Sequence, residues 1–192
     1  MGCHGSFSLD EPTRRSWYNP EAVLSEAGLR SDMMFADIGC GDGFFSILAA
    51  QIVGETGTVF AVDSDEKAIE RLRSKATRLN LGNIKAVVGT AEKTVFCKAC
   101  IDLVFYSMVL HDFEAPAQVL LNAKKMLKPS GTLANLDWKK ARMPIGPPFA
   151  IRFSEQDTLG LLKMAGFNRS KVKDAGLYHY LVMSKPSEYC GL

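Results

Sequence analysis

A glycine-rich turn is the first feature of the sequence that could bind a ligand. Asp37 precedes three glycines at alternate positions, Gly39, Gly41 and Gly43, at the end of a short apolar run. Glycines allow a tight turn that approaches a ligand closely, and the amides that open a following helix attract polar or anionic groups. A plain strand-to-helix turn without a ligand is the alternative interpretation.

The charges near this turn indicate which class of ligand it would take. The dinucleotide fingerprint G-x-G-x-x-G fails because Phe44 occupies the third glycine position, and no Walker P-loop occurs. Asp37 would repel a pyrophosphate, whereas it would attract an ammonium or sulfonium by a few kcal/mol. Asp63 ends the apolar run 60–63, where a carboxylate can accept both hydroxyls of a ribose. Its alternative role is to cap a helix together with Ser64.

Short apolar runs alternate with amphipathic stretches, and this alternation predicts the elements that position these residues. Strands are expected at residues 33–38, 57–62, 84–88, 101–107, 132–137, around Val172, and at 179–183. Helices are expected at residues 20–28, 44–53, 64–79, 114–127, and from a capping box at Ser154 to Gly166. Residues 128–131 are expected to form a turn and residues 138–153 a long loop.

Apolar strands separated by helices are typical of a parallel sheet covered on both faces. The sequence therefore predicts an α/β fold, a three-layer Rossmann-like sandwich. The last two strands are joined by a short turn containing Gly176, so we expect them to pair antiparallel. Ligands of such sheets bind at the carboxyl ends of the strands.

Composition excludes several classes of protein. The chain has 192 residues, of which 47% are hydrophobic and 23% charged, so neither disorder nor a collagen-like fibre is expected. A net charge of +2 and a pI of about 8.2 argue against a dedicated nucleic-acid binder. No apolar run reaches membrane-spanning length and the N-terminus lacks a signal-peptide core, so no membrane partner and a cytoplasmic location are expected.

Five segments carry a family resemblance: ADIGCGDGFFS (36–46), FAVDSDEKAIERL (60–72), GTAEKTVF (89–96), IDLVFYSMVLHDF (101–113) and LKPSGTLANLDW (127–138). In this order they resemble the class I S-adenosylmethionine-dependent methyltransferases, with particular similarity to the small ubiquinone/menaquinone-biosynthesis-like group. The resemblance covers about residues 33–138. It implies a seven-stranded, mostly parallel sheet with the last strand antiparallel, S-adenosyl-L-methionine as cofactor and S-adenosyl-L-homocysteine as product.

The resemblance also implies a set of cofactor-binding residues. Asp37 and the glycine turn would hold the methionine part, Asp63 the ribose, and the carbonyl of Ser107 the ammonium. Ser64 would lie near the adenine, and the loop of Thr90 to Glu92 would border the edge of the adenine ring. The whole set is Asp37, Gly39, Cys40, Gly41, Asp63, Ser64, Thr90, Ala91, Glu92 and Ser107. Thr90 stands where the family usually has an acidic residue, and a neutral acceptor makes the weaker hydrogen bond to adenine.

His111 is the candidate catalytic base, because an imidazole titrates near neutral pH and this one follows Ser107 by four residues. Its alternative role is packing at a helix entry, and Asp112 is expected to cap that helix.

Trp17, Tyr18 and Trp138 could form the wall of an acceptor pocket or shield the sulfonium, or they could simply pack. We expect this pocket to form from residues 1–18, the segment after Ser107 and the long loop. His179 is expected to be structural.

Methyl transfer to a small-molecule acceptor is the expected function, because the chain carries no added recognition domain. One alternative is an RNA or protein methyltransferase on the same fold, for which the basic residues Lys139, Lys140 and Arg142 give weak support. These three residues could equally be a solvated loop face. A catalytically inactive cofactor-binding protein is the other alternative. The oligomeric state is not specified by the sequence.

Residues 1–192 are expected to form a single methyltransferase domain. It would comprise an N-terminal arm and helix (1–30), a cofactor-binding core (33–138), and a long loop, helix and final strand pair (139–192).

The five cysteines are scattered, which is typical of reduced thiols rather than a disulfide framework. Cys97 and Cys100 could form half of a zinc site with Cys3 and His4, or a redox pair. No second C-x-x-C motif occurs. We therefore expect two unligated thiols and no metal.

Overall fold

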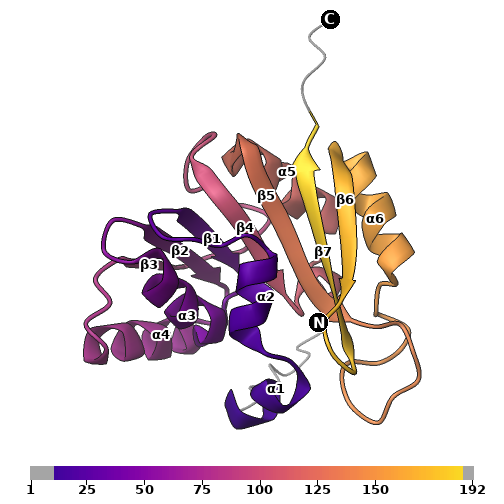
Figure 1. Cartoon of the computed structure of the whole chain (residues 1–192), viewed down its shortest axis with the longest axis horizontal. Coiled ribbons are helices and arrows are strands. Elements are labelled where there is room, and N and C mark those ends of the chain that lie inside the picture. Colours follow the sequence, from indigo (N-terminus) through magenta and orange to yellow (C-terminus); the bar gives the residue numbers. More distant parts are fainter. Residues whose placement is uncertain (1–10, 188–192) are drawn as a thin grey trace, which may run out of the picture.

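The computed structural model describes residues 11–187 of the chain. The helices are α1 (Glu11–Trp17), α2 (Pro20–Glu26), α3 (Phe44–Val53), α4 (Glu66–Arg78), a 3-10 turn η1 (Leu110–Asp112), α5 (Pro116–Met126) and α6 (Glu155–Met164). The strands are β1 (Met34–Ile38), β2 (Thr58–Asp63), β3 (Ile84–Val88), β4 (Ile101–Ser107), β5 (Leu127–Trp138), β6 (Phe167–Asp174) and β7 (His179–Pro186). Their arrangement is shown in Figure 1.

All seven strands form one sheet in the order β3-β2-β1-β4-β5-β7-β6. The first five pair in parallel, whereas β7 runs antiparallel to both β5 and β6. The predicted fold class is therefore confirmed, including the antiparallel last strand. Because β1 lies between β2 and β4, the loops that follow these three strands lie at one edge of the sheet.

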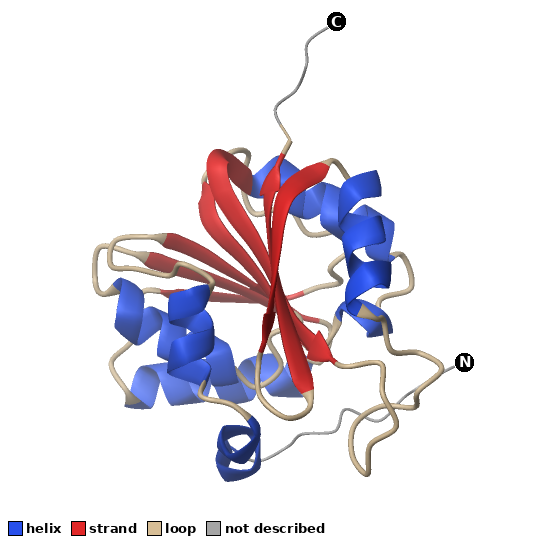
Figure 2. Ribbon diagram, turned by 45° about the vertical axis from the view of Figure 1, so that its right-hand side comes forward, coloured by secondary structure: helices blue, strands red, loops and turns tan. Residues whose placement is uncertain are grey.

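Helices cover both faces of the sheet, giving three layers (Figure 2). On one face, α2 and α3 bury apolar side chains such as Leu24 and Phe45 against Phe35 and Phe105. On the opposite face, α5 and α6 pack against the alternate residues of the same strands. Strand residues alternate between faces, so each buried strand needs apolar side chains at nearly every position. This explains the continuous apolar runs in the sequence.

Two predicted boundaries are wrong for local reasons. Strand β5 begins at Leu127, so residues 128–131 continue a strand instead of forming a turn. Lys128 Nζ donates to the Asp102 carboxylate at 2.7 and 2.9 Å, and the irregular pairing between β4 and β5 accommodates the extra residues there. Helix α4 is capped by Asp65 rather than by Ser64, because the Asp65 carboxylate accepts a hydrogen bond from the Lys67 amide.

The predicted capping box at the start of α6 is confirmed. The Ser154 hydroxyl accepts from the Asp157 amide at 3.1 Å, and the Asp157 carboxylate accepts from the Ser154 amide at 2.9 Å. Between residues 11 and 187, no helix combines the length and apolar character needed to cross a membrane.

Candidate functional site

The glycine turn follows β1 and leads directly into α3. Gly39, Gly41 and Gly43 have φ angles of 74°, 54° and 88°, in the left-handed region that favours glycine. The amides of Gly39 and Cys40 donate to the Val62 carbonyl at 2.8 and 3.0 Å, which holds the turn against the end of β2. A Cβ added at Gly41 would meet no heavy atom within 4 Å. The turn therefore exposes its middle residue to open space.

Asp63 links the glycine turn to the next crossover. Its Oδ2 accepts a hydrogen bond from the Gly41 amide at 2.7 Å, and its Oδ1 accepts one from the Asp65 amide at 2.9 Å. The sequence predicted that Asp63 and the glycines would lie together, and the structure does bring them together. The carboxylate is part-buried, so a ligand at the open side of the turn would meet it directly.

Asp37 is buried beneath the turn at the end of β1, with a relative exposure of 1%. Ser46 of α3 donates its hydroxyl proton to Asp37 Oδ2 at 2.6 Å, whereas Oδ1 has no hydrogen-bond partner within residues 11–187. The pKa of Asp37 is raised to about 7, mainly by burial; the Ser46 hydrogen bond opposes the shift and the neighbouring Asp63 charge adds to it. Such a carboxylate is suited to a positively charged partner.

The loop that carries Thr90, Ala91 and Glu92 is fixed from beneath by α5. Asn122 is 3% exposed, and its amide nitrogen donates to the Ala91 carbonyl at 3.3 Å and to the Glu92 carbonyl at 2.7 Å. Sequence reasoning missed Asn122. The feature that could have identified it is an amide side chain on the otherwise apolar face of a helix. Ser64 lies exposed on the crossover after β2.

Cys97 and Cys100 are joined in a disulfide in the segment before β4. The prediction of two unligated thiols is therefore wrong. The reason is local geometry, because the chain turns between the two residues and brings their Cα atoms to 6.1 Å, within disulfide range. Cys40, in the glycine turn, is a buried free thiol whose pKa is raised by burial. Within residues 11–187, no three His, Cys, Asp or Glu side chains gather as a metal-ligand set.

His111 lies in η1, where the chain leaves the carboxyl end of β4. Its ring Nδ1 lies 2.8 Å from Asp137 Oδ1, and both side chains are almost fully buried. Asp137 stands near the end of β5, the strand beside β4, and sequence reasoning missed it. Its signal was a carboxylate inside an otherwise apolar run that ends at the ligand edge of the sheet. Ser107, the last residue of β4, has a buried hydroxyl oxygen without a partner among the described residues.

The three aromatic residues predicted for an acceptor pocket are brought together, around His179. The ring centroids of Trp138 and His179 are 4.2 Å apart, those of Tyr18 and His179 are 5.0 Å apart, and those of Trp17 and Trp138 are 5.3 Å apart. Tyr18 and Trp138 are nearly fully buried. These contacts tie the N-terminal helices to the carboxyl end of β5, and Figure 1 shows α1 at that end of the sheet. Residues 1–10 of the predicted pocket lie outside the described residues.

Arg152, a third residue that sequence reasoning missed, organises the long loop after β5. It is 4% exposed, and its guanidinium donates to the carbonyls of Pro147, Ala141 and Ile145 at 2.7, 3.0 and 3.0 Å. A guanidinium can satisfy several carbonyls at once because it carries five donors in one plane. The loop is therefore an ordered wall beside the site, although it has no regular secondary structure.

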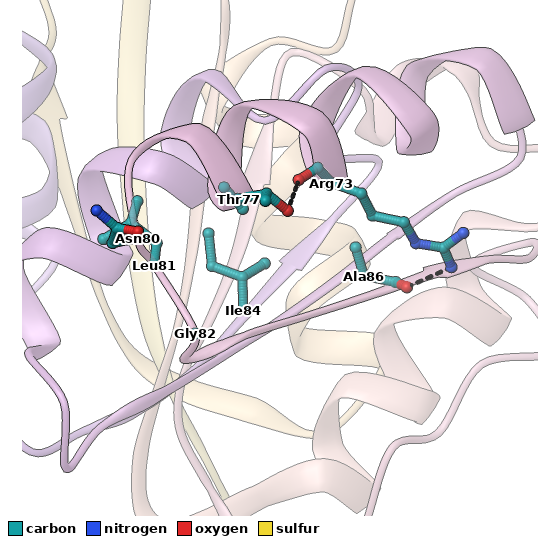
Figure 3. Close-up of a pocket in the computed structure, with 8 residues that line it drawn as sticks. Arg73, Thr77, Asn80, Leu81, Gly82, Ile84 and Ala86 are labelled. Atoms are coloured by element: carbon teal, nitrogen blue, oxygen red, sulfur yellow. Dashed lines mark hydrogen bonds between the residues drawn. The ribbon is translucent and has the colours of Figure 1, made fainter.

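An open groove of about 420 Å³ lies away from these residues, between the carboxyl half of α4 and β3 (Figure 3). Arg73 spans it and donates to the Ala86 carbonyl at 2.8 Å. The groove includes the approach to the amino end of β3, and none of the predicted site residues lines it. The predicted residues of the sheet lie instead at the carboxyl ends of β1, β2, β3, β4 and β5.

The chain is similar to known methyltransferases in sequence and in structure. A family model described as a methyltransferase domain matches residues 29–159. The ubiquinone/menaquinone biosynthesis C-methyltransferase UbiE of Haemophilus ducreyi is 32% identical over 159 residues, which cover 82% of this chain and 59% of that protein. A demethylmenaquinone methyltransferase of Listeria monocytogenes is 31% identical over 108 residues, which cover 56% of this chain and 46% of that protein. The chain thus matches about half the length of these curated relatives.

A solved structure is similar over nearly its whole length. The crystal structure of a SAM dependent methyltransferase from Aquifex aeolicus matches with a TM-score of 0.87 and 32% identity, covering 92% of this chain and 94% of that one. The family model alone spans more than half of the chain. The chain therefore belongs to the class I S-adenosylmethionine-dependent methyltransferases, close to the ubiquinone/menaquinone-biosynthesis group.

Proposed function

We propose that this enzyme transfers a methyl group from S-adenosylmethionine to a small-molecule acceptor at the carboxyl edge of the sheet. The observation that carries the proposal is Asp37, a carboxylate buried beneath the glycine turn, one oxygen of which has no partner among residues 11–187. An unpartnered buried carboxylate is costly unless a ligand completes it. The methyl donor supplies the methyl group on a positively charged sulfur, and its methionine part carries an ammonium.

The residues for the methyl donor lie at the carboxyl ends of four strands, β1 to β4. Asp37 and the turn Gly39–Gly43 would hold the methionine part, and the Ser107 carbonyl would accept from its ammonium. Asp63 would accept from the ribose hydroxyls, exchanging part of its bonding to backbone amides for bonding to the ligand. Ser64 and the loop Thr90–Glu92 would border the adenine, in a position that Asn122 fixes.

A small-molecule acceptor is supported by two independent observations. Both curated relatives described above are named for quinone-biosynthesis methyltransferases. In addition, Lys139 and Lys140, two of the three residues that gave support to nucleic acid, make ion pairs within the chain to Asp174 at 2.6 Å and to Asp157 at 3.2 Å. Paired lysines offer less to a phosphate backbone than free ones. Trp17, Tyr18 and Trp138 would wall the acceptor pocket from the N-terminal side.

His111 is proposed as the base that takes the proton from the acceptor. Its ring lies at the end of β4, between the proposed ammonium site at Ser107 and the end of β5. Methyl transfer itself requires mainly correct positioning of the two reactants. A base is needed where the acceptor atom carries a proton that it must lose.

Calorimetric titration with S-adenosylhomocysteine tests the methyl-donor site. We expect binding to the native protein, no binding of NAD, and an affinity at least tenfold weaker for Asp63→Ala. Asp42→Ala is a matched control, because Asp42 lies in the same turn but pairs with Lys75 at 2.6 Å. Thermal unfolding of each variant shows that it is folded. An unchanged affinity for Asp63→Ala would contradict the ribose assignment.

Methyl donor labelled in its methyl group tests the acceptor class. Incubation with fractionated metabolites and, separately, with total RNA is expected to label a small molecule and not the RNA. Label recovered in RNA would overturn the proposal of a small-molecule acceptor, while leaving the methyl-donor site intact.

A further inference from the structure

His111 and Asp137 form a buried pair between two neighbouring strand ends. The His111 side chain is 2% exposed and the Asp137 side chain 1%, and Nδ1 lies 2.8 Å from Oδ1. Water therefore does not compete for this contact. A hydrogen bond between an imidazole and a carboxylate in such surroundings is stronger than the same bond at a surface.

The Asp137 carboxylate is held in a fixed orientation. Its Oδ1 also accepts a hydrogen bond from the Trp138 amide at 2.8 Å, so rotation of the group would break two contacts together. Its Oδ2 is buried without a partner among residues 11–187. An ionised carboxylate only accepts hydrogen bonds, so the His111 nitrogen that faces it must carry the proton. Nε2 is then the nitrogen with a free lone pair.

Two further charged groups act on the His111 ring. Asp112, on η1 itself, has its Oδ1 3.6 Å from Nε2, beyond hydrogen-bond distance, and its side chain is 52% exposed. Arg152, on the long loop, adds a positive charge nearby. Burial lowers the pKa of His111, as does Arg152, but the hydrogen bond and charge of Asp137 and the charge of Asp112 outweigh them and leave it raised.

We propose that Asp137 is the positioning residue of the reaction, holding His111 as the Nδ1–H tautomer with Nε2 free to take the acceptor's proton. This inference rests on the proposed role of His111 as the base. In that step, an electron pair of the acceptor atom forms the new bond to the methyl carbon, and the pair of its bond to hydrogen stays on that atom. The pair of the broken carbon–sulfur bond stays on sulfur, and the proton moves to Nε2. Asp137 stabilises the resulting imidazolium without taking the proton itself.

Nitrogen-15 NMR of the imidazole rings tests the inference without any acceptor. The chain has three histidines, so a His111→Gln variant identifies the His111 signals. We expect His111 to be the Nδ1–H tautomer, with a pKa above that of a free imidazole. In Asp137→Asn, which keeps the shape but removes the charge, burial should prevail and the pKa should fall below the free value.

Asp112→Asn is the matched control, since it removes a carboxylate on the other side of the same ring. We expect it to lower the pKa of His111 less than Asp137→Asn does and to leave the tautomer unchanged. An Nε2–H tautomer in the native protein would overturn the inference, even if Asp137→Asn does not fold. A His111 pKa that is equal in the native protein and Asp137→Asn would overturn it as well.

The same samples separate this inference from the proposed function. Asp137→Asn should bind S-adenosylhomocysteine with native affinity, because Asp137 is not among the proposed methyl-donor residues. If the native protein fails to bind S-adenosylhomocysteine, the proposed methyl-donor site is wrong, whereas the tautomer and pKa of His111 still decide the role of Asp137.

Discussion

Asp37 shows how a single residue can be unfavourable for folding and useful for binding. Its carboxyl group is almost completely buried, and one of its oxygens has no partner among the described residues. Burial raises its pKa to about 7, far above the value of about 4 for an exposed carboxyl. Folding therefore favours the protonated form, and ionisation between pH 4 and pH 7 destabilises the folded chain. A bound ammonium would reverse that preference.

We expect Asp37→Asn to stabilise the protein while it weakens the methyl-donor site. The amide removes the buried charge, so the melting temperature should rise by about 2–6 °C at pH 8 and change little at pH 4. Binding of S-adenosylhomocysteine at pH 8 should weaken at least tenfold. Melting curves and calorimetry at the two pH values measure both effects. A lower melting temperature at pH 8 would show that the Asp37 charge is already compensated in the unliganded protein.

The turn between β1 and α3 combines two kinds of glycine. Gly43 is the N-cap of α3 and has a left-handed backbone, and a Cβ there would collide with Leu72 of α4. Gly41 has a similar backbone conformation but faces open space and donates its amide to Asp63. Gly43 is therefore needed for packing between elements, and Gly41 for the shape of the binding surface.

Gly43→Ala and Gly41→Ala separate these two requirements. Gly43→Ala should cost about 2–4 kcal/mol of stability, because left-handed strain is added to overpacking against Leu72. Gly41→Ala should cost only about 1 kcal/mol, because strain acts alone, yet it should weaken binding of S-adenosylhomocysteine. Chemical denaturation and calorimetry test the pair. Equal losses of stability would mean that Leu72 moves aside at low cost.

At the scale of the whole molecule, an aromatic cluster around His179 joins the N-terminal helices to the sheet. Trp17 and Tyr18 meet Trp138 at the end of β5 and His179 at the start of β7. Neither ring nitrogen of His179 has a partner among residues 11–187. Burial, reinforced by positive charges including Lys139, lowers the pKa of His179 to about 3, so the ring is neutral in the folded protein.

This cluster should make the fold sensitive to acid. The unfolded chain binds a proton at His179 below about pH 6.5, whereas the folded chain does so only near pH 3, so stability is lost as the pH falls through this range. His179→Phe keeps an aromatic ring and removes the titration. We expect it to gain about 2 kcal/mol over the native protein at pH 5 and to differ little at pH 8. If denaturation curves show that the native protein and His179→Phe lose the same free energy of unfolding between pH 8 and pH 5, this role of His179 is contradicted.

Local patterns in the sequence were sufficient for the strands, most helices and the glycine turn. The run at 101–107 matches β4, because a strand buried on both faces must be apolar throughout, and the run at 84–88 matches β3, a partly exposed edge strand. Asp37, Asp63 and the glycines share one edge of the sheet because each follows a parallel strand. The family resemblance added a single seven-stranded, mostly parallel sheet, which local periodicity does not specify.

The tertiary structure alone decided the contacts between residues far apart in the chain. Asp137 meets His111 because β5 lies beside β4, and Asn122 reaches the loop at Ala91 because α5 packs beneath it. The Cys97–Cys100 disulfide depended on the turn between them, which a four-residue motif leaves undetermined. The chain thus fixed which groups are present and on which elements they stand. Packing fixed which of them share a low-dielectric interior, and therefore which carry an altered pKa.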